Sequence, residues 1–232
     1  MVRKEWKQYT SSSVYVINTG IGVLLLIVAS VALLINKDAV LSGVQGIGLA
    51  GEILPYLIPF AAAFFLAMTN TADVSISLEG RQLPLLKSLP LRPMTIFQGK
   101  ILLNLMLTAP AVLISMPVLA AAMGLTLYQA VLGLLLLLEY AVLFAALGIA
   151  INLCFPNFDW SSDVAVVKQS MASFVGIFSG FLLAAVPAGA FFLFPPDKAP
   201  LVLAAVAVLI GVLDIAVFAL LKGWGSQRFQ RL

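Results

Sequence analysis

Glu139 and Asp214 are the side chains of this chain best placed for chemistry, because each lies inside a long apolar stretch. A carboxyl group at membrane depth is costly to bury, and it often marks the path of an ion or a proton. Glu139 could instead be protonated or hydrogen-bonded and only fasten helices, and Asp214 could pair with Lys222. Asn104, near the start of another apolar stretch, can hydrogen-bond a neighbouring helix. Glu139, Asp214 and Asn104 are therefore the candidate intramembrane polar residues.

Other kinds of chemistry find no support in the sequence. The chain has no histidine and a single cysteine, Cys154, which excludes histidine-based metal sites, Ser-His-Asp catalysis and an internal disulfide. The pairs Gly99-Lys100 and Lys222-Gly223 lack the upstream glycine and the following Ser or Thr of a phosphate-binding loop. We therefore expect no catalytic residue, no metal site and no ATP bound by this chain itself.

The elements that position these groups are predicted to be membrane-spanning helices. The chain is 62% apolar and 10% charged, with a mean hydropathy of +1.10, whereas about a quarter of the residues of a soluble domain are charged. About 20 mainly apolar residues cross the hydrocarbon core as a helix, and no apolar stretch alternates with period 2 as a strand would. The prediction is an all-α polytopic membrane protein, a single six-span domain over residues 1–232 with spans at 17–35, 51–71, 101–123, 127–153, 170–194 and 200–221.

The basic residues predict the orientation of the six spans. With a cytoplasmic N-terminus, eleven Lys and Arg residues face the cytoplasm and two, Lys37 and Lys198, face outward. This distribution obeys the positive-inside rule, so both termini are expected to be cytoplasmic. The basic residues behind the net charge of +3 then set the orientation of the chain in the lipid bilayer, which is its expected partner, and do not indicate nucleic-acid binding. The eleven residues are Arg3, Lys4, Lys7, Arg81, Lys87, Arg92, Lys100, Lys168, Lys222, Arg228 and Arg231.

Two connections have a clear pattern outside the spans. Residues 1–16 combine basic residues with Trp6 and Tyr9, which is typical of a helix lying at the membrane interface, as a topology anchor or with a mechanical role. Residues 36–51, on the outer side, are rich in glycine and are expected to form a flexible connector.

Residues 73–100 form the longest polar interval of the chain and are predicted to be a cytoplasmic loop. Pro84 suits the first turn of a helix, and Pro90 and Pro93 stop it, so a short helix with exposed leucines is expected. Leucines outside the bilayer need an apolar partner, either the membrane surface or another protein. Residues 155–169 are predicted to be a second cytoplasmic loop, in which Ser161 or Ser162 could cap a short helix.

The fifth span carries a ridge of small residues at every fourth position. Such a ridge lets another helix approach closely. The helix that packs against this ridge could belong to the same bundle or to another subunit. The ridge consists of Ala172, Gly176, Gly180, Ala184 and Ala188.

The segment SLEGRQLPLLKSLPLRPMTIFQGK resembles the cytoplasmic coupling loop of bacterial ABC type-2 permeases, the membrane subunits of ABC exporters. The matching features are Glu79 with Gly80, the leucine-rich helix, Pro90 after Leu89, and Gly99-Lys100 before the third span. The opening KEWKQYTSSSVYVINTGIG resembles the interfacial elbow helix and first span of that family, and NLCFPNFDWSSDVAVVKQS resembles its second cytoplasmic loop in a Gram-positive subgroup. Members of that subgroup are often twice as long, and this chain resembles their C-terminal six-span half.

The resemblance implies a permease subunit that is not itself an enzyme and lies in the bacterial cytoplasmic membrane. Its expected partners are a separate P-loop ATPase, which binds ATP and Mg²⁺, and a second permease half, either a copy of this chain or a missing N-terminal half. The substrate would be exported. The residues expected to dock the ATPase are Glu79, Gly80, Arg81, Leu85, Leu86, Lys87, Leu89, Phe158, Asp159, Trp160 and Lys168.

The competing hypothesis is an ion-coupled secondary carrier or a channel that uses Glu139 and Asp214. Dependence of transport on ATP or on an ion gradient separates the two. An intramembrane enzyme is disfavoured because histidine and the common catalytic motifs are missing.

Overall fold

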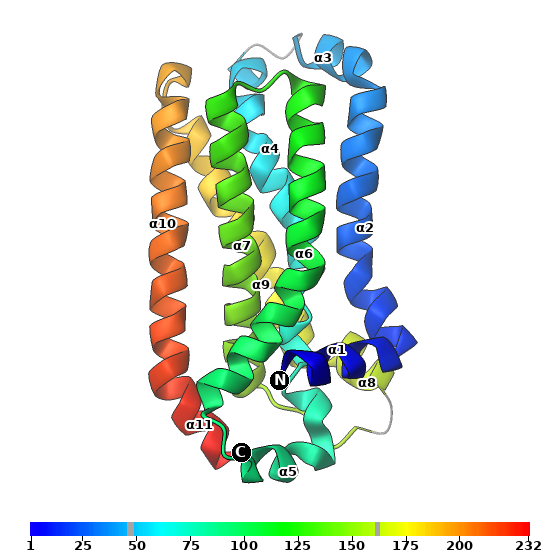
Figure 1. The fold of residues 1–232 in the computed structure, drawn as a ribbon. Helices are drawn as coiled ribbons and strands as arrows, with labels where there is room; N and C mark the ends of the chain where they lie inside the picture. Colours follow the sequence, from blue (N-terminus) through cyan, green and yellow to red (C-terminus); the bar gives the residue numbers. More distant parts are fainter. Residues whose placement is uncertain (46–48, 161–162) are drawn as a thin grey trace.

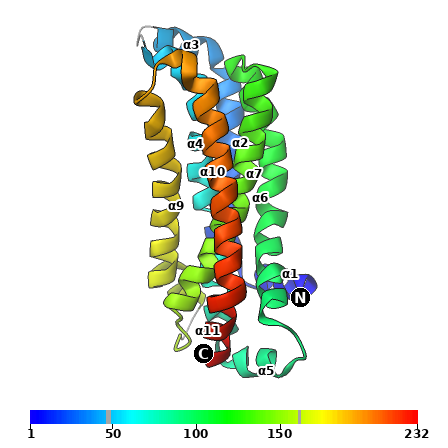
Figure 2. The same ribbon diagram turned by 90° about the vertical axis from the view of Figure 1, so that its left-hand side faces the viewer.

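The computed structural model describes residues 1–45, 49–160 and 163–232, with the backbone alone at residues 44, 45, 49, 50, 81, 163, 165 and 168. Six long helices run side by side between the two ends of an elongated bundle (Figures 1 and 2). The described residues contain no strand. This confirms the predicted all-α, six-span architecture, and the six helices are α2 (Ser13–Ile35), α4 (Leu49–Ala67), α6 (Pro93–Met123), α7 (Leu127–Cys154), α9 (Met171–Gly189) and α10 (Ala199–Leu220).

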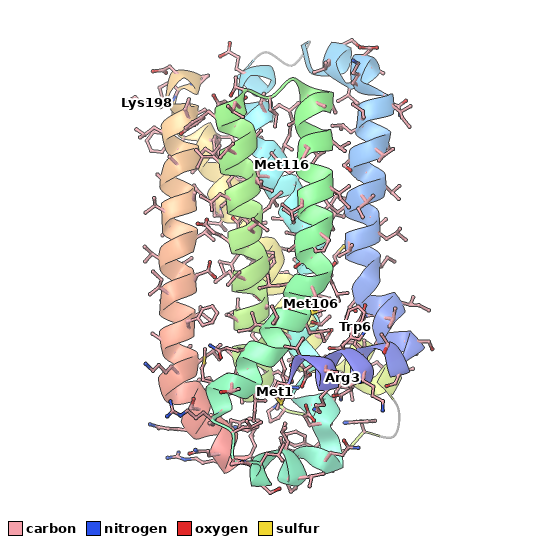
Figure 3. All side chains as sticks on the ribbon, viewed as in Figure 1. Met1, Arg3, Trp6, Met106, Met116 and Lys198 are labelled. Carbon is pink, nitrogen blue, oxygen red and sulfur yellow. The ribbon has the colours of Figure 1, made fainter. Side chains whose placement is uncertain are left out.

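Both termini lie at one end of the bundle, which we call the basal end (Figure 1). Helix α1 (Val2–Ser11) lies across the bundle there, and Met1, Arg3 and Trp6 are far from Lys198 at the opposite end (Figure 3). The opposite end holds α3 (Lys37–Gln45) and the short turns η3 (Ala190–Phe192) and η4 (Pro196–Lys198). The other basal elements are α5 (Leu83–Ser88), α8 (Asp163–Gln169), the π-helical turn η5 (Leu221–Gly225) and α11 (Ser226–Arg231).

Three boundaries differ from the prediction for identifiable physical reasons. Helix α2 begins at Ser13 because the Ser12 side chain accepts a hydrogen bond from the Tyr15 N–H and caps the helix. Helix α6 begins at Pro93, eight residues early, because proline suits a first helical turn and the next turn buries its apolar side chains. The expected flexible connector 36–51 is wrong, since α3 occupies Lys37–Gln45.

The turn between α6 and α7 is set by its own sequence. Gly124 ends α6 with φ 62°, a left-handed conformation that favours glycine. Thr126 and Gln129 then form a reciprocal capping box: Thr126 Oγ1 accepts from the Gln129 N–H (3.3 Å), and Gln129 Oε1 accepts from the Thr126 N–H (2.8 Å). Two long helices are thereby joined by a short antiparallel connection.

Helix α7 is the centre of the bundle and packs against α4, α6, α9 and α10. Leu136, Leu137 and Tyr140 on this helix are fully buried. The Tyr140 hydroxyl donates to the Leu183 carbonyl (2.9 Å), which ties α7 to α9 and satisfies a polar group that would otherwise be costly to bury.

The small ridge of α9 is buried within the bundle. Ala172, Gly176, Gly180 and Ala184 are buried, and Gly180 faces Ala67 of α4. These four residues therefore pack against helices of the same bundle, which was the first of the two alternatives that the sequence left open. Ala188, at the opposite end of the ridge, is half-buried.

Gly22 makes the closest approach between α2 and α4. A Cβ at this position would overlap the Phe65 carbonyl oxygen and the Thr69 hydroxyl. We expect Gly22→Ala to lower the free energy of unfolding by about 1–3 kcal/mol, because a backbone carbonyl cannot rotate away. Gly20→Ala, whose added Cβ meets only the Tyr9 hydroxyl at 4.0 Å, is the matched control and should leave stability nearly unchanged. The measurement is unfolding by SDS in mixed micelles, and equal midpoints for the two variants would contradict this packing.

Candidate functional site

The segment between α4 and α5 is the most unusual feature of the bundle. It contains the short turns η1 (Ala72–Val74) and η2 (Ser77–Gln82) in place of a regular helix, and every residue from Thr69 to Gly80 is buried. Residues 73–80, the first part of the predicted cytoplasmic loop, are therefore enclosed by the bundle and do not form an exposed surface. Irregular backbone is tolerated in such a place only where the protein satisfies its polar groups.

Asn104 of α6 provides part of that compensation. Its Oδ1 accepts hydrogen bonds from the Thr71 N–H (3.0 Å) and the Thr71 hydroxyl (3.2 Å). The Tyr15 hydroxyl of α2 donates to the Thr71 carbonyl (2.7 Å). The predicted hydrogen bond of Asn104 to a neighbouring helix is confirmed, because its Nδ2 donates to the Ala141 carbonyl of α7 (3.5 Å). The bonds to the irregular segment are additional and were not predicted.

Asn152 of α7 holds the next turn, and sequence reasoning missed it. Its Oδ1 accepts from the backbone N–H groups of Ile76 (2.8 Å) and Ser77 (3.0 Å), while its Nδ2 donates to the Ser77 hydroxyl (2.7 Å). Asn152 is fully buried. An amide near the basal end of an apolar span was the available signal, since it resembles the signal at Asn104.

Four charged side chains form a cluster beneath this segment, which we call the ionic cluster: Lys4, Glu5, Glu79 and Lys100. The fully buried Lys100 ammonium lies 3.1 Å from Glu5 Oε2 and 2.6 Å from Glu79 Oε1, and it also donates to the Ser75 carbonyl (2.8 Å). The half-buried Lys4 pairs with Glu79 from the other side. Two positive and two negative charges thereby join α1, η2 and α6, which offsets the cost of burying them.

Gly80 makes a sharp bend within η2. Its backbone has φ 49° and ψ −126°, a conformation that side-chain-bearing residues rarely adopt. The Trp160 ring covers this glycine, 3.2 Å from where a Cβ would lie, and its indole N–H donates to the Ser77 carbonyl (2.9 Å). The bend turns the chain out of the buried segment and into α5.

Helix α5 presents one apolar face to the bundle and another to the outside. Leu83 and Leu86 are buried in a cluster with Phe97 of α6 and Phe229 of α11, whose rings meet edge to face at 5.6 Å. On the outer face Leu85 is 69% exposed and Leu89 is 45% exposed. The predicted short helix with exposed leucines is confirmed for these two residues, and Leu86 lies on the buried side.

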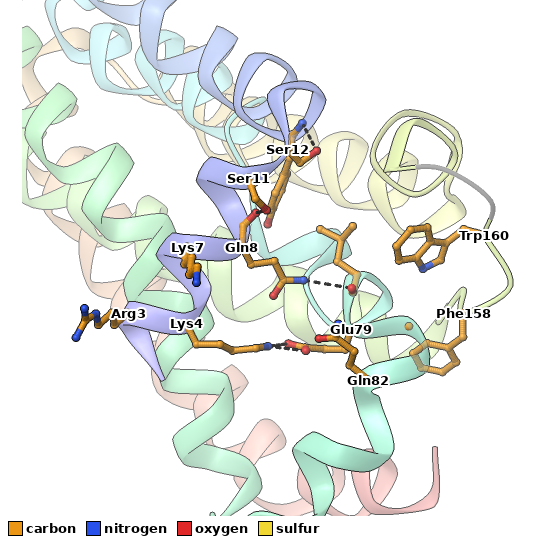
Figure 4. Close-up of a pocket in the computed structure, with 13 residues that line it drawn as sticks. Arg3, Lys4, Lys7, Gln8, Ser11, Ser12, Glu79, Gln82, Phe158 and Trp160 are labelled. Atoms are coloured by element: carbon orange, nitrogen blue, oxygen red, sulfur yellow. Dashed lines mark hydrogen bonds and ion pairs between the residues drawn. The ribbon is translucent and has the colours of Figure 1, made fainter.

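A groove of about 1190 Å³ opens between α1 and the η2 segment. Lys4 reaches from α1 across to Glu79, and Phe158 and Trp160 lie on the far side of the groove (Figure 4). The lining carries more basic than acidic side chains. It comprises Arg3, Lys4, Lys7, Gln8, Ser11, Ser12, Tyr15, Leu78, Glu79, Gly80, Gln82, Phe158 and Trp160.

The residues predicted to dock a partner are separated by the fold into three groups. Leu85, Leu89 and Asp159 are exposed, and Lys87, Phe158 and Trp160 are partly exposed. Glu79, Gly80 and Leu86 are buried and cannot present a surface in this conformation. The side chains of Arg81 and Lys168 lie outside the described residues.

Glu139 and Asp214 are brought to the same contact between α7 and α10. Gly211, one helical turn before Asp214, would place a Cβ 3.4 Å from Glu139 Oε1. Both side chains are half-buried, and Glu139 Oε2 and Asp214 Oδ1 are buried atoms with no hydrogen-bond partner in the described part of the chain. The suggested pairing of Asp214 with Lys222 is not among the ion pairs of the described residues.

In residues 1–45, 49–160 and 163–232, no group of three or more His, Cys, Asp or Glu side chains could hold a metal ion.

Comparison with protein-family models, curated proteins and solved structures gives no match. The fold therefore defines the class as a multi-pass membrane protein with six apolar helices.

Proposed function

We propose that this chain is the membrane-spanning permease subunit of an ABC exporter, driven by a separate P-loop ATPase. The observation that carries the proposal is α5, a short helix outside the long helices, whose exposed Leu85 is followed directly after the helix by the exposed Leu89 and Leu91. An apolar face of this kind fits a protein partner that holds a helix in a groove.

The packing behind α5 suits a helix that must transmit force. Leu83 and Leu86 press on Phe97 of α6, so a push on α5 reaches a long helix directly. The same segment is tied to α6 and α1 through Glu79, which pairs with Lys100 and Lys4. In this proposal closure of the ATPase moves α5, α6 and α1 together, which is a rigid-body step between two arrangements.

The second predicted contact lies beside the first. Phe158 and Trp160 line the groove next to η2, and the exposed Asp159 lies between them in the sequence. The basic groove wall on α1 suits an acidic partner surface. We place the basal end in the cytoplasm, because eleven of the thirteen Lys and Arg residues belong to segments near it.

The rest of the assembly follows from the same proposal. The subunit works in a bacterial cytoplasmic membrane, pairs with a second six-span half and moves substrate between the halves. ATP and Mg²⁺ bind the ATPase, and this chain is not an enzyme by itself.

The decisive test is co-purification of the ATPase from the native host. The tagged chain, gently solubilised, is expected to retain a P-loop ATPase that is identified by mass spectrometry. Leu85→Glu with Leu89→Glu should reduce the amount of retained ATPase at least tenfold, because the two leucines would be buried when the ATPase binds and the variant places charges there. Leu127→Glu, an exposed leucine at the opposite end, is the matched control and should retain it.

Two outcomes contradict the proposal in different ways. ATPase retained by the double variant removes the α5 face as the docking surface. Wild-type chain that brings down no ATPase, from membranes that contain one, argues against an ABC permease altogether.

An ion-coupled carrier or channel is the second candidate. The observation in its favour is that Glu139 and Asp214 approach the same helix contact with buried, unpartnered oxygens in the described residues. Transport driven by an ion gradient, in vesicles that contain this chain and no ATPase, would favour this candidate.

A further inference from the structure

Among the side chains that the structure describes, Asp73 is the most deeply buried carboxylate without a positive partner. It is 1% exposed, and no Lys or Arg in the described ion pairs reaches it. It accepts a hydrogen bond from Asn70 Nδ2, and that amide also donates to the Phe144 carbonyl (2.8 Å). The amide thus fixes the orientation of the carboxylate but does not neutralise its charge.

Two glycines make room for this carboxylate between α7 and α9. A Cβ at Gly148 or at Gly176 would overlap the Asp73 side chain. Gly176 lies five residues after the start of α9 at Met171, which places it about 8 Å along this helix. The carboxylate is therefore surrounded by protein, at the break where α4 gives way to η1.

A cavity of about 10 Å³ adjoins Asp73, close to the smallest volume that holds one water molecule or a bare ion of similar size. Its polar lining consists of Asn18, Thr19, Asn70, Asp73 and Ser173. These side chains come from α2, α9 and the break after α4. All of them carry oxygen atoms, the ligands that hard cations prefer.

The two hydroxyl groups of this cavity are arranged to accept and not to donate. Thr19 Oγ1 donates its proton to the Tyr15 carbonyl (2.7 Å), and Ser173 Oγ donates to the Val167 carbonyl (3.1 Å). Thr19 Oγ1 also lies 3.4 Å from the Tyr9 hydroxyl, and each of the two oxygens keeps a lone pair for a positive ligand. A proton on Asp73 would neutralise the charge equally well, but only a bound metal ion makes the stability of the chain depend on the salt that is present.

We propose that Asp73, Thr19, Asn18 and Ser173 form a binding site for one monovalent metal cation of the size of Na⁺. The ion compensates the buried charge and cross-links α2, α9 and the irregular segment after α4. Broken helices that bind small cations at unwound backbone are a known device of membrane transporters. The inference is independent of the proposed ATPase partner, because it rests on residues inside the bundle.

The test is cation-dependent stability of the full purified chain at one pH. Thermal unfolding is followed by circular dichroism in NaCl, KCl and choline chloride at equal ionic strength. NaCl at about ten times the dissociation constant of the ion is expected to raise the melting temperature by roughly 3–6 °C relative to choline chloride, because an ion that binds only the folded chain stabilises it. Radioactive sodium should bind with a stoichiometry of one ion per chain.

Variants connect the effect to the site. Asp73→Asn should lose both the sodium-dependent shift and the bound sodium, and Thr19→Val should raise the sodium concentration needed for the shift. Asp38→Asn, at an exposed carboxylate of α3, is the control that should keep both. If Asp73→Asn does not fold, wild type and Thr19→Val still decide the question. Equal melting temperatures of wild type in all three salts, or an unchanged sodium response in Thr19→Val, overturn the proposal.

Discussion

Lys100→Met is expected to lower the free energy of unfolding by about 3–5 kcal/mol, because removing one partner of a buried ion pair leaves an uncompensated charge. Methionine is similar to lysine in length, so the packing volume is largely kept. Glu5, which is buried, loses its contact with the Lys100 ammonium at 3.1 Å, so that Glu5 and Glu79 are then paired only with the half-buried Lys4. The buried Ser75 carbonyl also loses its donor.

The measurement for Lys100→Met is unfolding by SDS in mixed micelles, compared with Lys198→Met. Lys198 is exposed at the opposite end of the bundle, so its substitution should change stability by less than about 0.5 kcal/mol. Adding Glu79→Gln and Glu5→Gln to Lys100→Met should recover part of the loss, since the orphaned charges are then removed. A single variant as stable as wild type would show that the ionic cluster does not hold α1 to α6.

Asn152→Leu is expected to cost about 2–6 kcal/mol, because two buried backbone N–H groups lose their acceptor at roughly 1–3 kcal/mol each. The groups are those of Ile76 and Ser77, and both residues are buried. Leucine has the same branched shape and is no smaller than asparagine, so the substitution leaves no cavity and the lost hydrogen bonds account for the effect.

The same SDS titration tests this second prediction. Asn36→Leu is the control, since Asn36 is exposed and only donates to the Ala32 carbonyl of its own helix. Greater proteolysis of the chain near Ser77 in Asn152→Leu should accompany the loss of stability. A stable variant with unchanged proteolysis would mean that the irregular segment holds its shape without α7.

The two kinds of variant separate docking from force transmission under the proposed function. Leu85→Glu with Leu89→Glu removes the outer face of α5, whereas Lys100→Met leaves that face intact. We therefore expect Lys100→Met to retain the ATPase while it loses transport. Loss of the ATPase in both would place the ionic cluster in the docking surface itself.

Much of the fold could be predicted because it depends on local composition. Six apolar stretches of sufficient length predicted six spans, and Pro84 before a run of leucines predicted α5. Asn104 was singled out because an amide near an apolar span needs a partner, and its partners are Ala141 of the neighbouring helix α7 and Thr71 of the irregular segment.

The burial of residues 69–80 could not be predicted from the same patterns. The run TNTADVSISLEG is polar, and polarity ordinarily means solvent. Here Asn152 and Trp160 satisfy its backbone, and Lys100 pairs with its glutamate, so the segment is buried without loss of its hydrogen bonds. Glu79, which the family resemblance placed on a docking surface, lies inside the ionic cluster.

Hydropathy and charge are properties of each stretch alone, so the class of this protein, the number of its spans and the segregation of its basic residues follow from local sequence. Which polar groups meet depends on the tertiary structure. Lys100 and Glu5 are 95 residues apart, and Asn152 and Ile76 are 76 apart. Such pairs form only when the helices are packed together. A polar residue can be buried when a distant residue supplies the charge or hydrogen bond that it needs, and its local sequence does not reveal that partner.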